Sequence, residues 1–219
     1  MISSIYITRS LSEVPRLKSF CDENRIILHG YSQISFTPID FTVRHSFDVI
    51  FFSSPRSARF FLEKNTIAPN IAIACVGKGT AEYVLNLGFE ADFIGEKTGD
   101  PSENAADLAK WLGKRRILFP VSDISKGSML KFIPESQLEF VPVYKTAPEA
   151  RRVNDHDIYI FTSPSNISSF LLKNETPNRM VVAWGKSTEQ TLLELSIPVT
   201  FTLMKSEEEE LIGLLYSLL

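Results

Sequence analysis

Six turns in this sequence bring hydroxyl, glycine and basic residues together, and each turn follows a short apolar run. They are Thr8-Arg9-Ser10, Ser53-Ser54-Pro55-Arg56, Gly77-Lys78-Gly79-Thr80, Pro120-Val121-Ser122, Thr162-Ser163-Pro164-Ser165 and Gly185-Lys186-Ser187-Thr188. An amphipathic stretch follows each turn, and the free N–H groups and positive dipole end of a helix N-terminus favour anions. Ser and Thr also cap helices at such positions. The prediction of an anion site therefore depends on several of these turns meeting, with Arg9, Arg56, Lys78 and Lys186 supplying charge.

The known catalytic and cofactor motifs do not occur. Gly77-Lys78-Gly79-Thr80 lacks the upstream glycine and spacer of a P-loop, and Met180 stands where Gly185-Lys186-Ser187 would need that glycine. A GxGxxG fingerprint is absent as well. His29, His45 and His156 are scattered, without cysteine or carboxylate partners at metal-binding spacing. We expect neither a metal nor a cofactor.

Composition narrows the class of protein. The chain has 219 residues, 44% of them hydrophobic, and a formal net charge of −3. This charge argues against general nucleic-acid binding, and no apolar run reaches membrane-spanning length. Cys21 and Cys75 are too few for a disulfide framework, and Cys75 lies in an apolar run typical of a buried strand. Because no signal peptide is evident, we expect a cytoplasmic chain.

An internal repeat predicts two similar domains. The run from Asp48 to Pro55 returns 109 residues later, from Asp157 to Pro164, and Val76-Gly77-Lys78 is echoed by Trp184-Gly185-Lys186. The period is too long for a solenoid. We therefore interpret the chain as an internal duplication whose two domains enclose a ligand cleft.

Apolar runs that alternate with amphipathic stretches predict an α/β fold with doubly wound parallel sheets. Strands are expected at Ile5–Thr8, Asp48–Ser53, Ile71–Val76, Ala91–Ile94, Ile117–Pro120, Asp157–Thr162, Met180–Trp184 and Val199–Leu203. Helices are expected after Ser12, Pro55, Gly77, Ser102, Ser125, Pro164, Gly185 and Ser206. For the last helix, Ser206 and Glu209 have the spacing of a capping box.

Two apolar segments carry a proline, which cannot donate to a sheet ladder, so we expect them on edges or in connections. They are Phe36-Thr37-Pro38-Ile39 and Phe140-Val141-Pro142-Val143-Tyr144. We take them as paired crossings between the domains.

Over nearly its whole length the chain resembles the uroporphyrinogen-III synthase family. The resemblance rests on the order and spacing of Phe52-Ser53-Ser54-Pro55-Arg56, Val76-Gly77-Lys78-Gly79-Thr80-Ala81, Leu87-Gly88, Leu118-Phe119-Pro120, Val143-Tyr144-Lys145-Thr146, Phe161-Thr162-Ser163-Pro164-Ser165 and Trp184-Gly185-Lys186-Ser187-Thr188. It implies a monomeric, cofactor-free lyase that closes hydroxymethylbilane, a linear tetrapyrrole with eight carboxylates, into uroporphyrinogen III. Ring D is inverted and water is lost. The implied domains are 1–35 with 148–219 and 40–140, joined by linker strands 36–39 and 141–147.

The resemblance also assigns candidate roles. Tyr144 matches the tyrosine of the Val-Tyr-x-Thr motif and would assist departure of the hydroxyl as a proton donor. Candidate substrate-binding residues are Arg9, Ser54, Arg56, Lys78, Thr80, Ser163, Ser165, Lys186, Ser187 and Thr188. The chain departs from the family at Asn166, where many members have glycine, and at Val121-Ser122-Asp123, which places a carboxylate near a polyanion.

Three other readings stay open at this point. One is a degenerate, non-catalytic relative of the family. Another is a two-domain small-molecule binding module, which would be expected to carry a secretion signal or a DNA-binding extension. The third is a protein-interaction scaffold, which would require neighbouring helices to block the strand ends.

Overall fold

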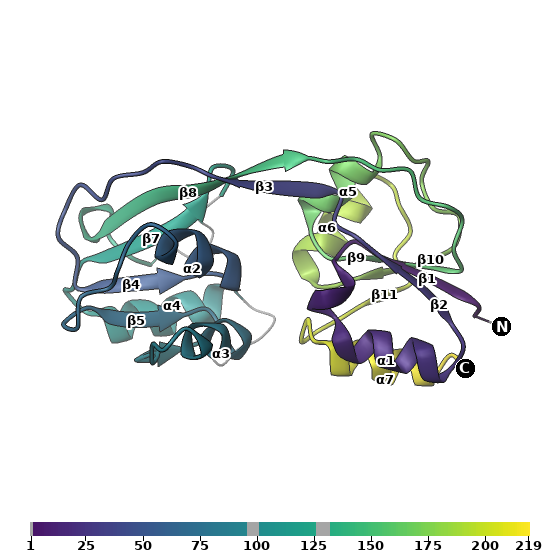
Figure 1. Ribbon diagram of the computed structural model, residues 1–219, viewed down its shortest axis with the longest axis horizontal. Coiled ribbons are helices and arrows are strands. Elements are labelled where there is room, and N and C mark those ends of the chain that lie inside the picture. The colour runs from purple at the N-terminus through teal and green to yellow at the C-terminus, as the bar shows by residue number, and fades with distance from the viewer. Residues whose placement is uncertain (1, 96–100, 126–131) are drawn as a thin grey trace. The chain divides into compact units, whose positions relative to one another are not determined.

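The structure is a computed structural model that describes residues 2–95, 101–125 and 132–219. The chain divides into two compact units, one made of Met1–Ser35 with Ala147–Leu219 and the other of Phe36–Thr146 (Figure 1). Compactness alone does not show that a unit folds independently, so the domain bounds expected from the sequence stay a prediction.

The discontinuous unit contains a five-stranded sheet. Its strand order is β11 (Phe201–Thr202), β10 (Met180–Ala183), β9 (Ile158–Phe161), β1 (Ser4–Ile7), β2 (Ile27–Gly30), and all of these neighbours are parallel.

Helices cover both faces of this sheet, because successive side chains of a strand point to opposite faces. Ile5 and Ile7 pack towards α1 (Pro15–Glu23) and α7 (Glu208–Tyr216), which lie together on one face (Figure 1). Tyr6 packs on the other face with residues of α5 (Pro164–Phe170) and α6 (Lys186–Glu194). A short 3-10 turn, η1 (Leu11–Glu13), precedes α1.

The continuous unit contains a six-stranded sheet. Its strand order is β3 (Ile34–Pro38), β8 (Leu138–Pro148), β7 (Ile117–Ser122), β4 (Val49–Phe52), β5 (Ala72–Cys75), β6 (Phe93–Ile94). The pairs from β8 to β6 are parallel.

The core of this unit also has two sides. Phe52 and Cys75 pack with residues of α2 (Pro55–Leu62) and α3 (Lys78–Asn86), whereas Val49 and Phe51 pack with residues of α4 (Pro101–Leu112). A 3-10 turn, η3 (Glu135–Gln137), leads into β8. Each unit is therefore doubly wound, as the alternating apolar pattern predicted.

The predicted strands and seven of the eight predicted helices are present, with shifts of a few residues at their ends. The helix expected after Ser125 falls on residues 126–131, which lie outside the described residues. The strand β2 was not predicted. Its side chains alternate between exposed and half-buried at the sheet edge, and its apolar run ends at Leu28, before His29 and Gly30, which is too short to mark a buried strand.

The second proline segment does not lie at a sheet edge, one of the two places expected for it, and its part as a connection between the domains stays a prediction. β3 lies at the sheet edge as expected, but β8 lies between β3 and β7. Its Pro142 is tolerated because the β7–β8 register shifts between Val121 and Ser122, and an irregular ladder does not require a donor at each position.

The predicted capping box of the last helix was also wrong. Ser206 has a φ of +58°, and Glu207 is the N-cap without a side-chain cap bond. The carboxylate of Glu210 instead accepts hydrogen bonds from the backbone N–H groups of Met204 and Lys205, both at 2.7 Å. The acidic run thus stabilises the approach to α7.

None of the helices in the described ranges is both long enough and apolar enough to cross a bilayer.

Candidate functional site

The turns of the discontinuous unit meet at the carboxyl ends of β1, β9 and β10. These strands are parallel neighbours with β9 in the middle, so the residues that follow them lie along one edge of the sheet. The guanidinium of Arg9, after β1, stacks over the ring of Trp184, after β10, with 4.5 Å from Cζ to the ring centroid. This contact reaches across the end of β9. The structure therefore brings together two turns that are 175 residues apart in the sequence.

The hydroxyl residues at this edge have different environments. Ser163 is the half-buried N-cap of α5, and Ser165 is half-buried in its first turn. Lys186 and Ser187 are exposed at the start of α6, whereas the Thr188 side chain is buried beneath them. The lack of a side chain at Gly185 lets this turn lie against Ser206, because a Cβ at position 185 would be only 2.8 Å from Ser206 Oγ. The accessible candidates are thus Ser163, Ser165, Lys186 and Ser187, together with half-buried Arg9.

The continuous unit has a matching edge at the ends of β4 and β5. Ser54 caps α2 by accepting a hydrogen bond from the Ser57 N–H at 3.1 Å. Lys78 is exposed as the first residue of α3, and Thr80 is buried two residues later.

Tyr144 lies on the same side of this sheet as α2, with its ring between two phenylalanines. Its ring centroid is 5.1 Å from that of Phe60, nearly parallel, and 5.9 Å from that of Phe36, edge to face. The Arg56 guanidinium lies 3.6 Å from the centroid of Phe36. Burial raises the pKa of the Tyr144 phenol, and the charge of Arg56 and hydrogen bonds with Ser54 and Arg56 oppose that increase. Three candidates of this unit, Ser54, Arg56 and Tyr144, are therefore in direct contact.

The carboxylate of Asp123 is engaged by donors from its own turn and from β8. Its Oδ1 accepts hydrogen bonds from the Thr146 N–H at 3.0 Å and from Ser122 Oγ at 3.1 Å. Ser122 Oγ is also 2.9 Å from Thr146 Oγ1. Local donors therefore offset part of the charge that would otherwise repel an anion here.

Several contributors to these edges were not selected from the sequence as site residues. Trp184 supports Arg9, Phe36 supports Arg56, and the hydroxyls of Thr8 and Thr162 lie 3.1 Å apart at the ends of β1 and β9. Each of these contacts joins segments distant in the sequence. The position of Trp184 directly before a Gly-Lys turn was a signal that could have identified it.

Two of the scattered histidines meet in the fold. His29 Nδ1 lies 2.7 Å from His156 Nε2, and His156 Nδ1 donates to the Asn154 carbonyl at 2.6 Å. Burial lowers the pKa of His156. Within residues 2–95, 101–125 and 132–219, no three His, Cys, Asp or Glu side chains form a group that could hold a metal ion.

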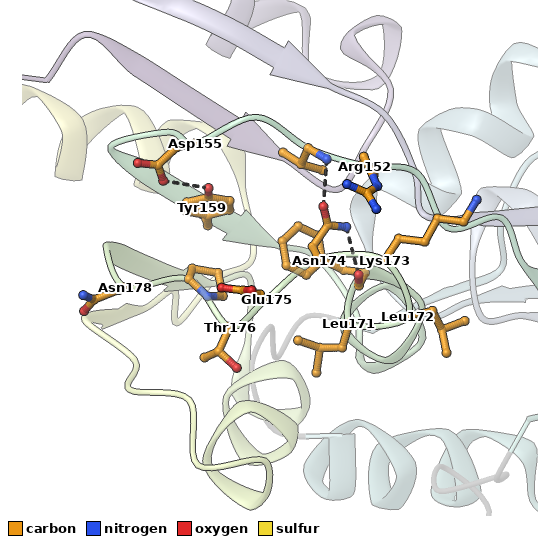
Figure 2. Close-up of a pocket in the computed structure, with 13 residues that line it drawn as sticks. Arg152, Asp155, Tyr159, Leu171, Leu172, Lys173, Asn174, Glu175, Thr176 and Asn178 are labelled. Carbon is orange, nitrogen blue, oxygen red and sulfur yellow. Dashed lines mark hydrogen bonds between the residues drawn. The ribbon is translucent and has the colours of Figure 1, made fainter.

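A hollow of about 770 Å³ opens at the opposite edge of the discontinuous unit's sheet. Its lining comes from residues before β9 and from the connection between α5 and β10, including Asp155, Tyr159 and Asn174 (Figure 2). Tyr159 donates to Asp155 Oδ1 at 3.2 Å, and Asn174 bonds to the backbone. These polar groups are therefore used in hydrogen bonds that stabilise the fold. We therefore place the candidate site at the carboxyl ends of the strands.

The fold and these turns define a class: an α/β protein of two doubly wound units whose strand ends offer hydroxyls, helix N-termini and single basic side chains. Such donors suit a small molecule with many carboxylates, held by many modest contacts. The described side chains at these edges supply a phenol and hydroxyls, but no activated nucleophile. Chemistry here would be proton donation and positioning.

The comparisons with known proteins agree with this class. The family model described as uroporphyrinogen-III synthase HemD matches residues 30–213. A uroporphyrinogen-III synthetase from Helicobacter pylori 26695 is similar in structure, with a TM-score of 0.70 and 17% identity over 100% of both chains. A mutant uroporphyrinogen III synthase from the extremely thermophilic bacterium Thermus thermophilus has a TM-score of 0.60 and 11% identity, over 99% of this chain and 98% of the other. No curated protein sequence matches.

Because the family model covers most of the chain, the chain belongs to the uroporphyrinogen-III synthase family, lyases of heme biosynthesis. Because the two solved structures share so little sequence identity with this chain, they support the assignment of the fold and nothing more. The α/β class, the enzyme class and the family inferred from the sequence are thereby confirmed.

Proposed function

We propose that this chain closes hydroxymethylbilane into uroporphyrinogen III, with inversion of ring D and loss of water, through the strand-end turns described above. The observation that carries the proposal is the family match over residues 30–213, which contains every candidate residue except Arg9. The chemistry of the turns supports it independently, since a substrate with eight carboxylates needs many donors.

The proposed proton donor is Tyr144. Loss of the substrate hydroxyl is driven by a pyrrole nitrogen and leaves a delocalised cation, so a weak acid beside the leaving oxygen is sufficient. A guanidinium has only donors, so the Tyr144 oxygen accepts from Arg56 and its own hydrogen can be directed to the leaving group. Phe36 and Phe60 surround the phenol with apolar surface, which strengthens such a bond.

The proposed carboxylate ligands act as a distributed set. They are Arg9, Ser54, Arg56, Lys78, Ser163, Ser165, Lys186 and Ser187, whereas Thr80 and Thr188, whose side chains are buried, are left out of the set. Because Lys78 and Lys186 are exposed, each should make only a modest contribution alone. Changing any one basic member to alanine should raise KM about 5- to 30-fold.

The test is to mix purified protein with freshly prepared hydroxymethylbilane and to determine the product isomer by chromatography after oxidation. Uroporphyrinogen III is expected. Formation of the uninverted isomer alone, at the spontaneous rate, would contradict the proposal and would favour a non-catalytic relative.

We further infer a monomer that acts in the cytoplasm without a cofactor, and a gene history of internal duplication. Matching backbone angles support the duplication: the N-caps Ser54 and Ser163 have φ and ψ of −167° and 158° and of −165° and 157°. Light scattering coupled to gel filtration measures the molar mass and so tests whether the chain is a monomer. Activity that persists after dialysis against a chelator is expected if no cofactor is needed.

A further inference from the structure

Asn166 lies at the centre of a hydrogen-bond network at the start of α5. Its Nδ2 and its backbone N–H both donate to Ser163 Oγ, at 3.0 and 3.3 Å. Its Oδ1 accepts from the backbone N–H of Gln33 at 2.7 Å and from Ser32 Oγ at 3.3 Å. The side chain is buried, so it links the candidate Ser163 turn to the segment that follows β2.

The orientation of the Asn166 amide follows from its partners. The backbone N–H of Gln33 can only donate, so the amide oxygen must face it and the NH₂ group must face Ser163. Ser163 Oγ then uses both of its lone pairs to accept from Asn166. Its hydrogen is all that remains for a further bond, and within the described residues Ser163 Oγ donates to no acceptor. Asn166 thus makes Ser163 a donor.

Gln33 holds the other side of the network rigidly. It is fully buried, its Nε2 donates to Tyr6 Oη at 2.8 Å, and its Oε1 accepts from the Arg151 N–H at 2.6 Å. Its carbonyl accepts from the Glu149 N–H at 2.8 Å and from Ser169 Oγ. The Asn166 oxygen is therefore bound to a fixed point in the core, and its amide group has little freedom to turn away from Ser163.

The corresponding turn of the continuous unit lacks this arrangement. Ser57 stands at the position equivalent to Asn166, and its Oγ donates to the Ser54 carbonyl at 2.8 Å instead of to the Ser54 hydroxyl. Ser54 Oγ accepts from the Ser57 N–H and interacts with Tyr144. The two caps have the same backbone conformation, but their hydroxyls have different roles. Ser54 is hydrogen-bonded to the Tyr144 phenol, whereas the Ser163 hydroxyl is available to a ligand.

We propose that Asn166 is a positioning residue that fixes the Ser163 hydroxyl as a hydrogen-bond donor to a carboxylate of the substrate. This inference rests on the proposed function, in which Ser163 contacts the substrate. It gives a role to a residue that stands where many family members have glycine. Pre-orientation of the donor lowers the entropic cost of the contact.

Two variants separate orientation from support. In Asn166→Ala the Ser163 hydroxyl can rotate, and KM should rise about 3-fold with kcat unchanged. In Asn166→Asp one carboxylate oxygen still accepts from Gln33, but the other can only accept and so captures the Ser163 hydrogen. KM should then rise about 10-fold or more. The new carboxylate would be buried, which lowers stability, and its place in the first turn of a helix offsets that cost only in part, so the melting temperature should fall and is measured beside KM.

A double-mutant cycle with Ser163→Ala tests whether Asn166 acts through Ser163. In the Ser163→Ala background neither Asn166 variant should raise KM further, since the donor is already lost. This background also isolates charge: an Asn166→Asp effect that persists there is plain repulsion of the substrate and would overturn the proposal. An equal Asn166→Ala effect in both backgrounds would overturn it too.

The matched control is Asn174→Ala. Asn174 is an asparagine of the same unit that accepts from the Val153 N–H and donates to the Phe170 and Arg151 carbonyls, at the opposite sheet edge (Figure 2). The Asn174→Ala substitution should lower the melting temperature without changing KM. A KM change as large as that of Asn166→Ala would reduce Asn166 to a structural role.

Failure of the proposed function is distinguished by a binding readout. The same cycle is measured as the Kd for uroporphyrin III, an octacarboxylate, by fluorescence quenching. Suppose that the wild-type chain does not cyclise hydroxymethylbilane, but the Kd values of the double-mutant series still show that Asn166 acts through Ser163. The catalytic proposal then fails, and the role of Asn166 stands. If Ser163→Ala leaves KM and Kd unchanged, the role of Asn166 fails.

Discussion

At the residue scale, the environment of Tyr144 determines what it can do. Burial between Phe36 and Phe60 keeps the phenol protonated, since desolvation raises its pKa above the ordinary value. A group that stays neutral over the working pH range can donate a hydrogen bond at each pH but cannot act as a base. We therefore expect no loss of rate through ionisation of Tyr144 between pH 6 and about 10.

Tyr144→Phe should slow ring closure without abolishing it. General-acid assistance is typically worth about 10²–10⁴-fold, and the leaving group here also departs spontaneously, so a loss near the lower end is expected. KM should change little. Because the uncatalysed path closes the ring without inversion, the variant should release more of the uninverted isomer. Rate and isomer ratio are measured together.

The control for this prediction is Phe60→Leu, which loosens the ring's packing but keeps the phenol. It should lower stability and leave the isomer ratio near the wild-type value. A wild-type rate and isomer ratio for Tyr144→Phe would leave catalysis to the remaining donors.

The two cysteines should be chemically inert in the folded chain. Both are fully buried, and burial raises the pKa of Cys21 to about 11 and of Cys75 to about 12. Because the thiolate is the reactive form, iodoacetamide at pH 8 should label neither residue until guanidinium is added. Mass spectrometry measures the labelling. Ser19→Cys, exposed on the same helix as Cys21, is the positive control, and rapid labelling of Cys21 in the native wild type would contradict the prediction.

At the scale of elements, aspartates tie neighbouring strands together at their starting ends. Asp157, before β9, accepts from the Ser3 N–H at 2.8 Å, from the Ser3 hydroxyl at 2.7 Å and from the Ser4 N–H at 3.0 Å, which fixes the start of β1. Asp48, at the equivalent position before β4, accepts from the Arg116 N–H at 2.8 Å at the start of β7. In both units the carboxylate sets the register of the adjacent strand.

Asp157→Asn should destabilise the fold in a pH-dependent way. Hydrogen bonds from the Ser3 side chain and backbone lower the pKa of Asp157 to about 2 in the folded chain. The native state therefore favours the ionised form, and this stabilisation is present above the unfolded pKa of about 4 and is lost as pH falls towards 2. At pH 7 the variant should lose about 1 kcal/mol, a value discounted because the carboxylate is near the surface.

Urea unfolding at several pH values measures this effect. The difference between wild type and Asp157→Asn should shrink as pH falls from 5 to 2.5. Asp22→Asn, which removes an exposed ion pair with Lys18, is the control and should cost less than about 0.5 kcal/mol. A difference that is constant with pH would show that the hydrogen bonds, and not the charge, stabilise the strand.

Most elements could be predicted because their information is local. Buried parallel strands such as Val49–Phe52 are short apolar runs, and Pro55 and Pro164 mark helix starts. The apolar run of the edge strand β2 is short and ends before His29, so its place depends on pairing with β1. Likewise, Pro142 reads as an edge residue until the irregular register beside it is known.

The candidate site was predictable only as a set of turns. Helix N-termini after parallel strands indicate where an anion binds, and this follows from sequence order. The contacts that decide roles join distant segments, such as Arg9 with Trp184 and Asn166 with Gln33. Whether the Ser163 hydroxyl donates or accepts a hydrogen bond depends on such partners, so no local sequence pattern could show it.

At the scale of the whole molecule, the chain leaves one unit and returns to it. The outgoing and returning segments are bonded where they meet, with 2.8 Å between the Glu149 N–H and the Gln33 carbonyl oxygen. The Arg151 N–H bonds to the Gln33 side chain at 2.6 Å. The whole of Phe36–Thr146 is thus an insertion into the discontinuous unit. Removal of the insertion should leave that unit's core intact.

The last prediction is that the two units fold independently when they are separated along this division. Ser35 and Ala147 each lie two residues, at most about 7 Å, from the bonded pair Gln33 and Glu149, so a Gly-Ser linker of about eight residues spans the gap. Both the linked polypeptide and the isolated 36–146 segment exceed the roughly 60 residues at which many domains fold alone. Each should unfold cooperatively in urea, and neither should cyclise hydroxymethylbilane, because the proposed donors are divided between them.

The control is to cut the chain into its continuous halves, 1–112 and 113–219. This cut separates β1 from β9 and β4 from β7, which are adjacent in the two sheets, so each half would have to expose the middle of a sheet. Neither half should unfold cooperatively. If the halves fold and the linked polypeptide does not, the discontinuous division of the chain is wrong, and the crossing segments belong to a different arrangement of domains.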